Sequence, residues 1–263
     1  MRPAHTPHLE LSDIVSTYEE GGRHLLALDG LSLIVGAAEF VAMVGPSGSG
    51  KSTLLNVVSG LIAQDSGTVR IGGDLTTATQ RLGKSAYMQQ RDLLLPWRTT
   101  TANAALGLEA SGTPRSDAER QATAQLQRFG LEGFGDAYPA QLSGGMRQRA
   151  AFLRTILPRK ELVLFDEPFG ALDALTRSDL QAWLAGLWEQ ERPSVLLVTH
   201  DVEEAIFLAD RVVVLTPRPG RVSFELAVAL PRPRTRAMIA SPEFIQDRAT
   251  LLQALGLLGD PPP

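Results

Sequence analysis

A glycine-rich segment has the residue types and spacing that bind the phosphates of a nucleotide: Gly45-Pro46-Ser47-Gly48-Ser49-Gly50-Lys51-Ser52-Thr53. Its glycines let the backbone turn its N–H groups inward around phosphate oxygens, and the helix expected to follow directs its positive dipole end to the same point. We expect Lys51 to reach the β- and γ-phosphates of ATP and Ser52 to bind Mg²⁺. The alternative is an ordinary glycine-rich turn before a helix.

Two carboxylates follow the apolar run 162–165, and they should therefore lie at the carboxyl edge of a sheet, where open α/β folds bind ligands. Asp166 is suited to hold Mg²⁺, because this ion prefers oxygen ligands and keeps several of its waters. Glu167 is then placed to orient or deprotonate an attacking water. The alternative is an acidic strand end without a chemical role.

A third motif, Leu142-Ser143-Gly144-Gly145-Met146-Arg147-Gln148-Arg149, predicts the start of a helix. Ser143 can cap this helix, while Gly144 and Gly145 leave room for a phosphate to approach the exposed N–H groups. Taken alone, the motif indicates only a helix cap. Because it follows the first motif and precedes Asp166 and Glu167, it resembles the signature sequence of the ATP-binding-cassette (ABC) superfamily.

This resemblance extends over nearly the whole chain and implies roles for four further residues. It implies that Gln89 senses Mg²⁺ and water and communicates with transport domains, and that Asp173 belongs to the D-loop. It also implies that His200 contacts the γ-phosphate and that Tyr18 stacks on adenine. The alternatives are a solvated glutamine, a histidine that caps a turn, and a tyrosine of the core or surface.

The resemblance further implies how the protein works and with what. Two copies enclose two ATP molecules with Mg²⁺, and the signature of each copy closes over the phosphate loop of the other. The implied partners are a second ATPase subunit, forming a homodimer, two transmembrane permease subunits and, indirectly, a substrate-binding protein. ATP binding draws the two copies together, hydrolysis lets them separate, and the permease converts that motion into alternating access.

Three stretches are similar to importers of the nitrate, sulfonate and taurine group, and to importers of a thiamine pyrimidine precursor: Leu93–Arg98, Phe169–Arg177 and Leu230–Arg234. The chain departs from the group at Thr99–Ala102 and Leu157–Lys160, and the transported solute stays open. We expect the apolar segment Leu93–Trp97 to form part of a groove for the permease, with local packing as the alternative.

The elements that must position these residues follow from the apolar patterns. Strands are expected at 9–15, 31–35, 40–44, 67–71, 162–165, 194–199 and 211–215, and helices at 52–61, 176–190 and 202–209. The fold class is therefore α/β, a phosphate-loop NTPase core with a parallel sheet and an N-terminal antiparallel β subdomain. The ATPase domain is expected over 1–240 with a helical insertion at about 99–155, followed by a helical tail over 241–263.

The charge and composition of the chain argue against nucleic-acid binding, secretion and membrane spanning. The net charge of −4 and the pI near 5.6 provide no general attraction to nucleic acid, so no nucleic-acid partner is expected. The chain lacks cysteine, which fits a reducing compartment, and neither a leader nor a run of about 18 apolar residues is evident. We expect a cytoplasmic protein that is peripheral on the inner face of the cell membrane through its permease.

Two other functions remain open from the sequence. One is a non-transport ABC ATPase that acts on ribosomes or DNA, although such proteins tend to carry two cassettes, coiled-coil insertions or basic patches. The other is a nucleotide-sensing subunit without turnover, against which Glu167 and His200 argue.

Overall fold

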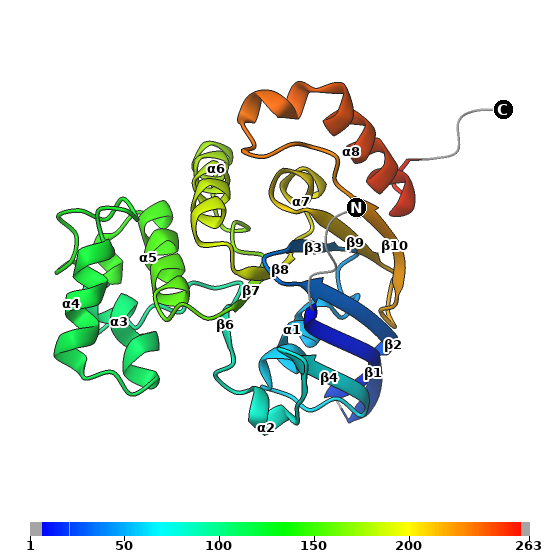
Figure 1. Cartoon of the computed structure of the whole chain (residues 1–263), viewed down its shortest axis with the longest axis horizontal. Helices are drawn as coiled ribbons and strands as arrows, with labels where there is room; N and C mark the ends of the chain where they lie inside the picture. The colour runs from blue at the N-terminus through cyan, green and yellow to red at the C-terminus, as the bar shows by residue number, and fades with distance from the viewer. Residues whose placement is uncertain (1–6, 21, 259–263) are drawn as a thin grey trace.

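The computed structural model describes residues 7–20 and 22–258, and its main sheet has six strands in the order β10-β9-β3-β8-β7-β6 (Figure 1). The pairs β3–β8, β3–β9, β7–β8 and β6–β7 are parallel, and β10 runs antiparallel to β9 at one edge. The strands are β3 (Phe40–Val44), β6 (Ser85–Met88), β7 (Leu162–Asp166), β8 (Ser194–Val198), β9 (Arg211–Leu215) and β10 (Val222–Ala227).

A second sheet is antiparallel, with the order β2-β1-β4-β5. It consists of β1 (Pro7–Glu20), β2 (Arg23–Gly36), β4 (Ser66–Ile71) and β5 (Asp74–Leu75). This is the predicted N-terminal β subdomain, and the predicted fold class is confirmed.

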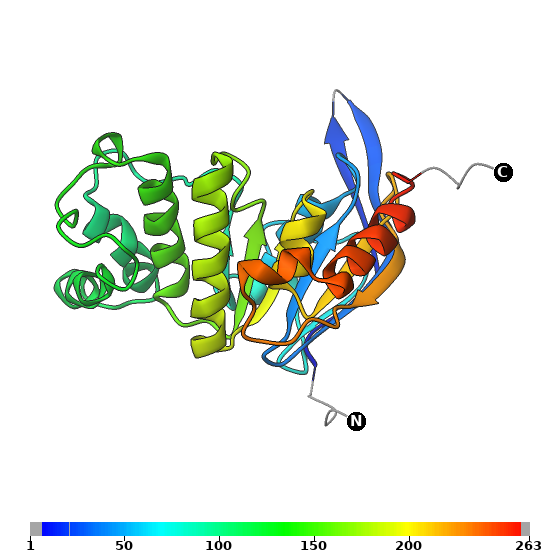
Figure 2. The same cartoon turned by 90° about the horizontal axis from the view of Figure 1, so that it is seen from above.

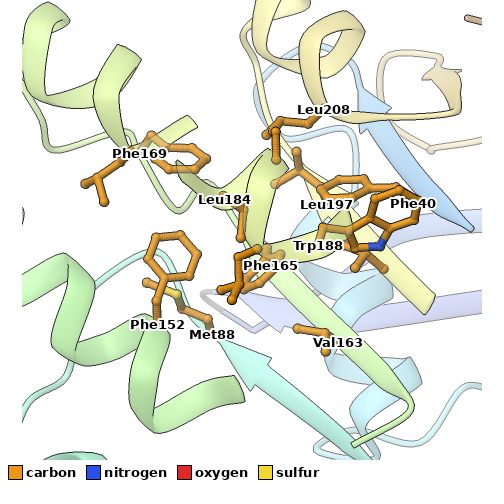
Figure 3. Close-up of a cluster of buried hydrophobic side chains, with 14 of the residues drawn as sticks. Phe40, Met88, Phe152, Val163, Phe165, Phe169, Leu184, Trp188, Leu197 and Leu208 are labelled. Atoms are coloured by element: carbon orange, nitrogen blue, oxygen red, sulfur yellow. The ribbon is translucent and has the colours of Figure 1, made fainter. Parts of the chain in front are cut away.

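The central strands form because their apolar runs can be covered on both faces. Every residue of β3, β7 and β8 is buried, as expected for a parallel sheet between two layers. On one face α1 (Lys51–Ser59) lies between the two sheets and fills the space with Leu54, Leu55, Val57 and Val58. On the other face the aromatic rings of Phe152, Phe165 and Phe169 lie near one another (Figure 3).

Two helices follow strands that end at the carboxyl edge of the main sheet. After β7 and a short loop comes α6 (Ala174–Glu191), and after β8 comes α7 (Val202–Leu208). Each begins directly after an aspartate cap, Asp173 and Asp201, whose carboxylates accept hydrogen bonds from the first-turn N–H groups. The caps fix where these helices begin, and so fix the loops that precede them.

The segment between β6 and β7 is helical and lies to one side of the sheets, on the left of Figure 1. It contains α3 (Thr100–Ala110), α4 (Arg115–Gln125), the short turn η1 (Pro139–Gln141) and α5 (Gly144–Ile156). Figure 2 shows α5 beside α6, so this helical lobe joins the core through the start of α6.

The chain after β10 returns over α7. A turn, η2 (Arg236–Ala240), precedes α8 (Pro242–Ala254), which contacts α7 and β10 and buries Phe244 and Leu251. Residues 259–263 of the predicted helical tail lie outside the described residues. The short helix α2 (Ala78–Arg81) completes the fold, and none of the described helices has the length and apolar character needed to span a bilayer.

Three strands were not predicted from the sequence: the two-residue β5, β6 and β10. The four residues of β6 are too few for a periodic pattern to stand out. In β10 the residues alternate between half-buried and exposed, and the prolines at 219 and 231 on either side suggested extended tail segments rather than a paired strand.

Candidate active site

The glycine-rich segment forms a loop between the end of β3 and the start of α1, as predicted. Gly50 has a φ of 90°, and a Cβ there would lie 2.7 Å from the carbonyl oxygen of Ala27, so glycine is required for both conformation and space. Gly48 also has a positive φ, of 77°. The loop can therefore turn tightly and present backbone N–H groups at the amino end of α1.

Lys51 is directed back over this loop. Its Nζ donates to the carbonyl oxygens of Gly45 and Pro46, both at 2.8 Å, and to Ser49 Oγ at 3.3 Å. Burial lowers the pKa of Lys51, while the negative charges of Glu167 and Asp166 raise it. The ammonium group is thus held over the loop by the loop's own carbonyl and hydroxyl oxygens.

Asp166 ends β7 and faces the first turn of α1. Its Oδ1 accepts from Ser52 Oγ at 3.2 Å, and its Oδ2 accepts from Tyr87 Oη at 3.4 Å. Burial raises the pKa of Asp166, an effect that the two hydrogen bonds and the charge of Lys51 oppose and the charge of Glu167 adds to.

The residues present fit Mg²⁺ and fit poorly a metal that needs a full set of protein ligands. Ser52 and Asp166 supply two neighbouring oxygen atoms, and no group of three or more His, Asp or Glu side chains suited to a metal occurs among residues 7–20 and 22–258. Mg²⁺ takes few protein ligands and completes its shell with water and phosphate oxygens.

Glu167 receives two side chains from other parts of the chain. Gln90 Nε2 donates to Glu167 Oε2 at 2.9 Å, and His200 Nδ1 lies 3.3 Å from the same oxygen. The backbone of Glu167 has a φ of 45°, which is unusual for a residue with a side chain, and its N–H donates to Val198 O at 2.8 Å. The hydrogen bond to β8 holds this strained conformation, in which the carboxylate contacts Gln90 and His200. Backbone strain of this kind clusters at functional sites.

The glutamine that meets Glu167 is Gln90 and not Gln89. The family resemblance implied Gln89, on the match of Tyr87-Met88-Gln89 to the Q-loop, but the Gln89 side chain is exposed and makes no hydrogen bond among the described residues. Within a strand, neighbouring side chains alternate, but β6 ends at Met88 and the chain turns there. The pattern of the strand therefore could not decide between two adjacent glutamines.

His200 and Glu167 line one cleft with the start of α5. The cleft has a volume of about 680 Å³, and the residues that line it include Gln90, Asp92, Gly144, Arg147, Glu167 and His200. Asp173 lies beside it as the cap of α6, and the hydrogen bonds from Thr176 lower the pKa of its carboxyl. The predicted base, histidine and D-loop thus come together at one edge of the sheet.

Ser143 caps α5 as predicted, accepting from the N–H of Met146 at 3.2 Å. Both Ser143 and Gly144 are exposed, and Gly145 packs so closely on α6 that a Cβ would lie 2.8 Å from Thr176 Cγ2. No hydrogen bond or ion pair joins this helix start to the phosphate loop within the described part of the chain. The start of α5 therefore lines the cleft with Glu167 and His200 without being bonded to the phosphate loop of its own chain.

Tyr18 lies on β1 and has 37% of its surface exposed. Its hydroxyl accepts a hydrogen bond from Arg218, in the loop between β9 and β10, at 2.9 Å. An exposed ring near the phosphate loop is available for stacking, as the sequence predicted, and that role stays a prediction.

Comparison with known proteins decides the family. Residues 28–170, from β2 to the loop after Glu167, match the family described as ABC transporter. The chain belongs to the ABC transporter family.

Relatives of this ABC transporter chain are named as import proteins. It is 42% identical to the formylaminopyrimidine import ATP-binding protein of Halalkalibacterium halodurans, over 85% of this chain and 86% of that protein. It is 38% identical to the nitrate import ATP-binding protein of Synechocystis, over 91% of each chain. It is 43% identical to the taurine import ATP-binding protein of Chromobacterium violaceum, over 86% of this chain and 88% of that protein.

The fold of this ABC transporter chain matches a dimeric structure of the bacterial cassette MJ0796 with a TM-score of 0.74 and 30% identity, covering 85% of this chain and all of the other. A second structure of that cassette, with a TM-score of 0.74, is a post-hydrolysis state bound to ADP and phosphate. The prediction of an ABC ATPase that binds ATP and couples its hydrolysis to transport is confirmed.

Proposed function

We propose that this chain powers the import of a small solute through a membrane permease. One observation supports this proposal most: Gln90 and His200 converge on Glu167, beside the cluster of Lys51, Ser52 and Asp166. A site built only to sense a nucleotide has no use for a strained carboxylate held by two polar side chains. The names of the import relatives support the direction of transport.

The chain's own residues account for the steps of hydrolysis. The loop N–H groups and Lys51 bind the β- and γ-phosphates, and Ser52 and Asp166 would hold Mg²⁺, which neutralises charge developing on the phosphate oxygens. Glu167 orients the attacking water and accepts its proton. The Gln90 amide and His200 position this carboxylate, so we assign to Gln90 the sensing role predicted for Gln89.

A second copy completes the site. Since Ser143 and Gly144 are exposed at the start of α5 and form no hydrogen bond to the phosphate loop among the described residues, this helix start is available to bind the γ-phosphate held by a partner. The helix dipole then stabilises the charge of the transition state, a duty that an arginine finger has in GTPases. The dimeric cassette structures support this arrangement.

The permease partner is proposed to dock near the loop that follows β6. Trp97 is 71% exposed and Leu93 is 47% exposed, and large apolar side chains at such exposure indicate a contact surface. The chain would then act on the cytoplasmic face of the membrane, as a homodimer with two permease subunits and, indirectly, a substrate-binding protein. For the solute we propose the classes in the relatives' names, a nitrate-, sulfonate- or taurine-like anion or a formylaminopyrimidine.

Uptake by the reconstituted transporter tests this function. The chain is combined in vesicles with candidate permease and substrate-binding proteins, and uptake of labelled nitrate, taurine and formylaminopyrimidine is measured with and without ATP. We expect ATP-dependent uptake of one solute, and none when the chain carries Glu167→Gln. Uptake that proceeds equally without ATP, or efflux in place of uptake, would contradict the proposal.

A further inference from the structure

The loop Thr216–Arg221 joins β9 to β10 and brings a cation to Tyr18, 200 positions away in the sequence. Arg218 Nη1 donates to Tyr18 Oη at 2.9 Å. Within the described residues this is the one hydrogen bond of the Arg218 side chain, and it forms no ion pair there. Within the described residues, the guanidinium group therefore forms its one polar contact with the Tyr18 hydroxyl.

This loop is fixed to the phosphate-loop region by its backbone, independently of the Arg218 side chain. Gly220 N–H donates to Ala27 O at 2.8 Å, and Asp29 N–H donates to Gly220 O at 3.2 Å. A Cβ at Gly220 would lie 2.0 Å from Ser49 O, so the loop touches the phosphate loop directly. Thr216 Oγ1 closes the turn by donating to Pro219 O at 3.0 Å. The arginine is thus presented from a rigid support that shares contacts with the nucleotide site.

A ring that stacks on a base gains affinity when it is already held in its bound orientation. Tyr18 is more than a third exposed on its strand, so packing alone fixes its ring weakly. A hydrogen bond from a charged donor restricts the ring before the nucleotide arrives and reduces the ordering cost of binding.

We propose that Arg218 is a positioning residue for nucleotide binding, which holds the Tyr18 ring for stacking on the base. The inference rests on the proposed stacking role of Tyr18. It concerns a residue outside the phosphate loop and the signature, in a loop that the sequence motifs did not single out. Because Arg218 acts on the base end of the nucleotide, it contributes to affinity and leaves the hydrolysis step unchanged.

Binding of MgATP to the purified chain, measured by calorimetry, tests the proposal with inorganic tripolyphosphate as a probe that lacks the base. We expect Arg218→Ala and Tyr18→Phe each to weaken ATP binding about three- to tenfold, the size of the ordering cost of one side chain on binding. The double variant should be no weaker than either, and Arg218→Lys should restore part of the loss. Tripolyphosphate affinity should not change, and in the reconstituted transporter KM for ATP should rise at constant kcat.

Arg221→Ala is the matched control, because Arg221 belongs to the same loop and pairs with Asp29 instead of the tyrosine. Unchanged ATP affinity in Arg218→Ala, or equal weakening of tripolyphosphate, would overturn the inference. Tyr18→Ala distinguishes failure of the Arg218 inference from failure of the proposed stacking of Tyr18. If this variant binds ATP like the parent, the stacking role itself is wrong. If Tyr18→Ala weakens ATP binding while Arg218→Ala and Tyr18→Phe do not, only the inference fails.

Discussion

The sheet edge that carries Glu167 and the helical lobe that carries Ser143 differ in how many of their functional groups find partners within the same chain. At the sheet edge, groups from four segments meet within one chain: the phosphate loop, the end of β7, Gln90 and His200. In the lobe, the start of α5 is capped by Ser143 and exposed, and among the described residues it forms no hydrogen bond or ion pair with the phosphate loop. Folding of one chain assembles the first region, whereas the second region is proposed to act on the nucleotide of a second copy.

In the proposed dimer, this difference makes hydrolysis conditional on the second copy. A chain whose catalytic carboxylate and phosphate loop are preassembled can bind a nucleotide alone, but the group that stabilises the transition state must come from elsewhere. The turnover of such a chain then depends on the approach of a partner, which a transporter can control.

The largest effect is expected at the sheet edge. Glu167→Gln should slow ATP hydrolysis by about 100-fold or more, because a general base typically contributes that much, while ATP-dependent dimerisation persists. Phosphate release and size-exclusion chromatography with MgATP measure the two quantities. Glu161→Gln, at the opposite end of β7 and exposed, is the matched control. Hydrolysis at the parent rate would show that Glu167 is not the base.

The lobe is tested by its helix cap. Ser143→Ala should lower hydrolysis by about tenfold or more, because a hydrogen bond to a charged phosphate contributes about 1.5–3 kcal/mol. ATP binding by the isolated monomer should not change. Thr99→Ala removes the cap of α3 in the same lobe, where Thr99 Oγ1 accepts from Ala102 N at 3.3 Å, and should leave turnover intact. If Ser143→Ala also weakens ATP binding by the monomer, the helical lobe contributes to the nucleotide site of its own chain, and the contrast with the sheet edge is wrong.

A third prediction concerns the surface beside the lobe. Trp97→Ala should weaken association with the permease subunits, measured by co-purification, by about 30-fold, because truncation of an aromatic anchor at an interface commonly costs about 2 kcal/mol or more. Nucleotide binding should stay unchanged. Ile245→Ala, a change at a 55% exposed apolar residue of α8, is the control. Unchanged assembly would mean that Leu93–Trp97 only packs locally.

The smallest effect is expected in α7, which begins after His200. Burial raises the pKa of Glu204 to about 8, and Gln181 Nε2 donates to its Oε2 at 3.1 Å. Since the folded state keeps this proton and the unfolded state loses it near its ordinary pKa of 4.5, stability falls as pH rises from that value toward 8. Glu204→Gln removes this cost.

The melting temperature of Glu204→Gln should therefore exceed that of the parent at pH 8 by several degrees, with the difference shrinking toward pH 5. For a chain of this size about 1 kcal/mol corresponds to about 2–4 °C. Glu203→Gln, at an exposed neighbouring position, is the control for the loss of charge. A difference that does not vary with pH would contradict the buried, protonated carboxyl.

Much of the fold was predictable because the strands of a parallel sheet are continuous apolar runs. The bounds of β3 and β9 agree with the predicted 40–44 and 211–215. The edge strand β10 was missed although Val222, Phe224 and Leu226 alternate with polar or small residues, because the prolines at 219 and 231 on either side suggested extended tail segments.

The sequence by itself determined the chemistry of the phosphate loop, the two carboxylates and the Ser143 cap. These depend on neighbouring residues, whose spacing along a strand, turn or helix start is set by local geometry. Tertiary structure alone decided that Gln90 rather than Gln89 meets Glu167, and that Arg218 meets Tyr18. Such contacts join segments far apart in the chain, and their partners are chosen by how the sheets and loops pack, which no local pattern records.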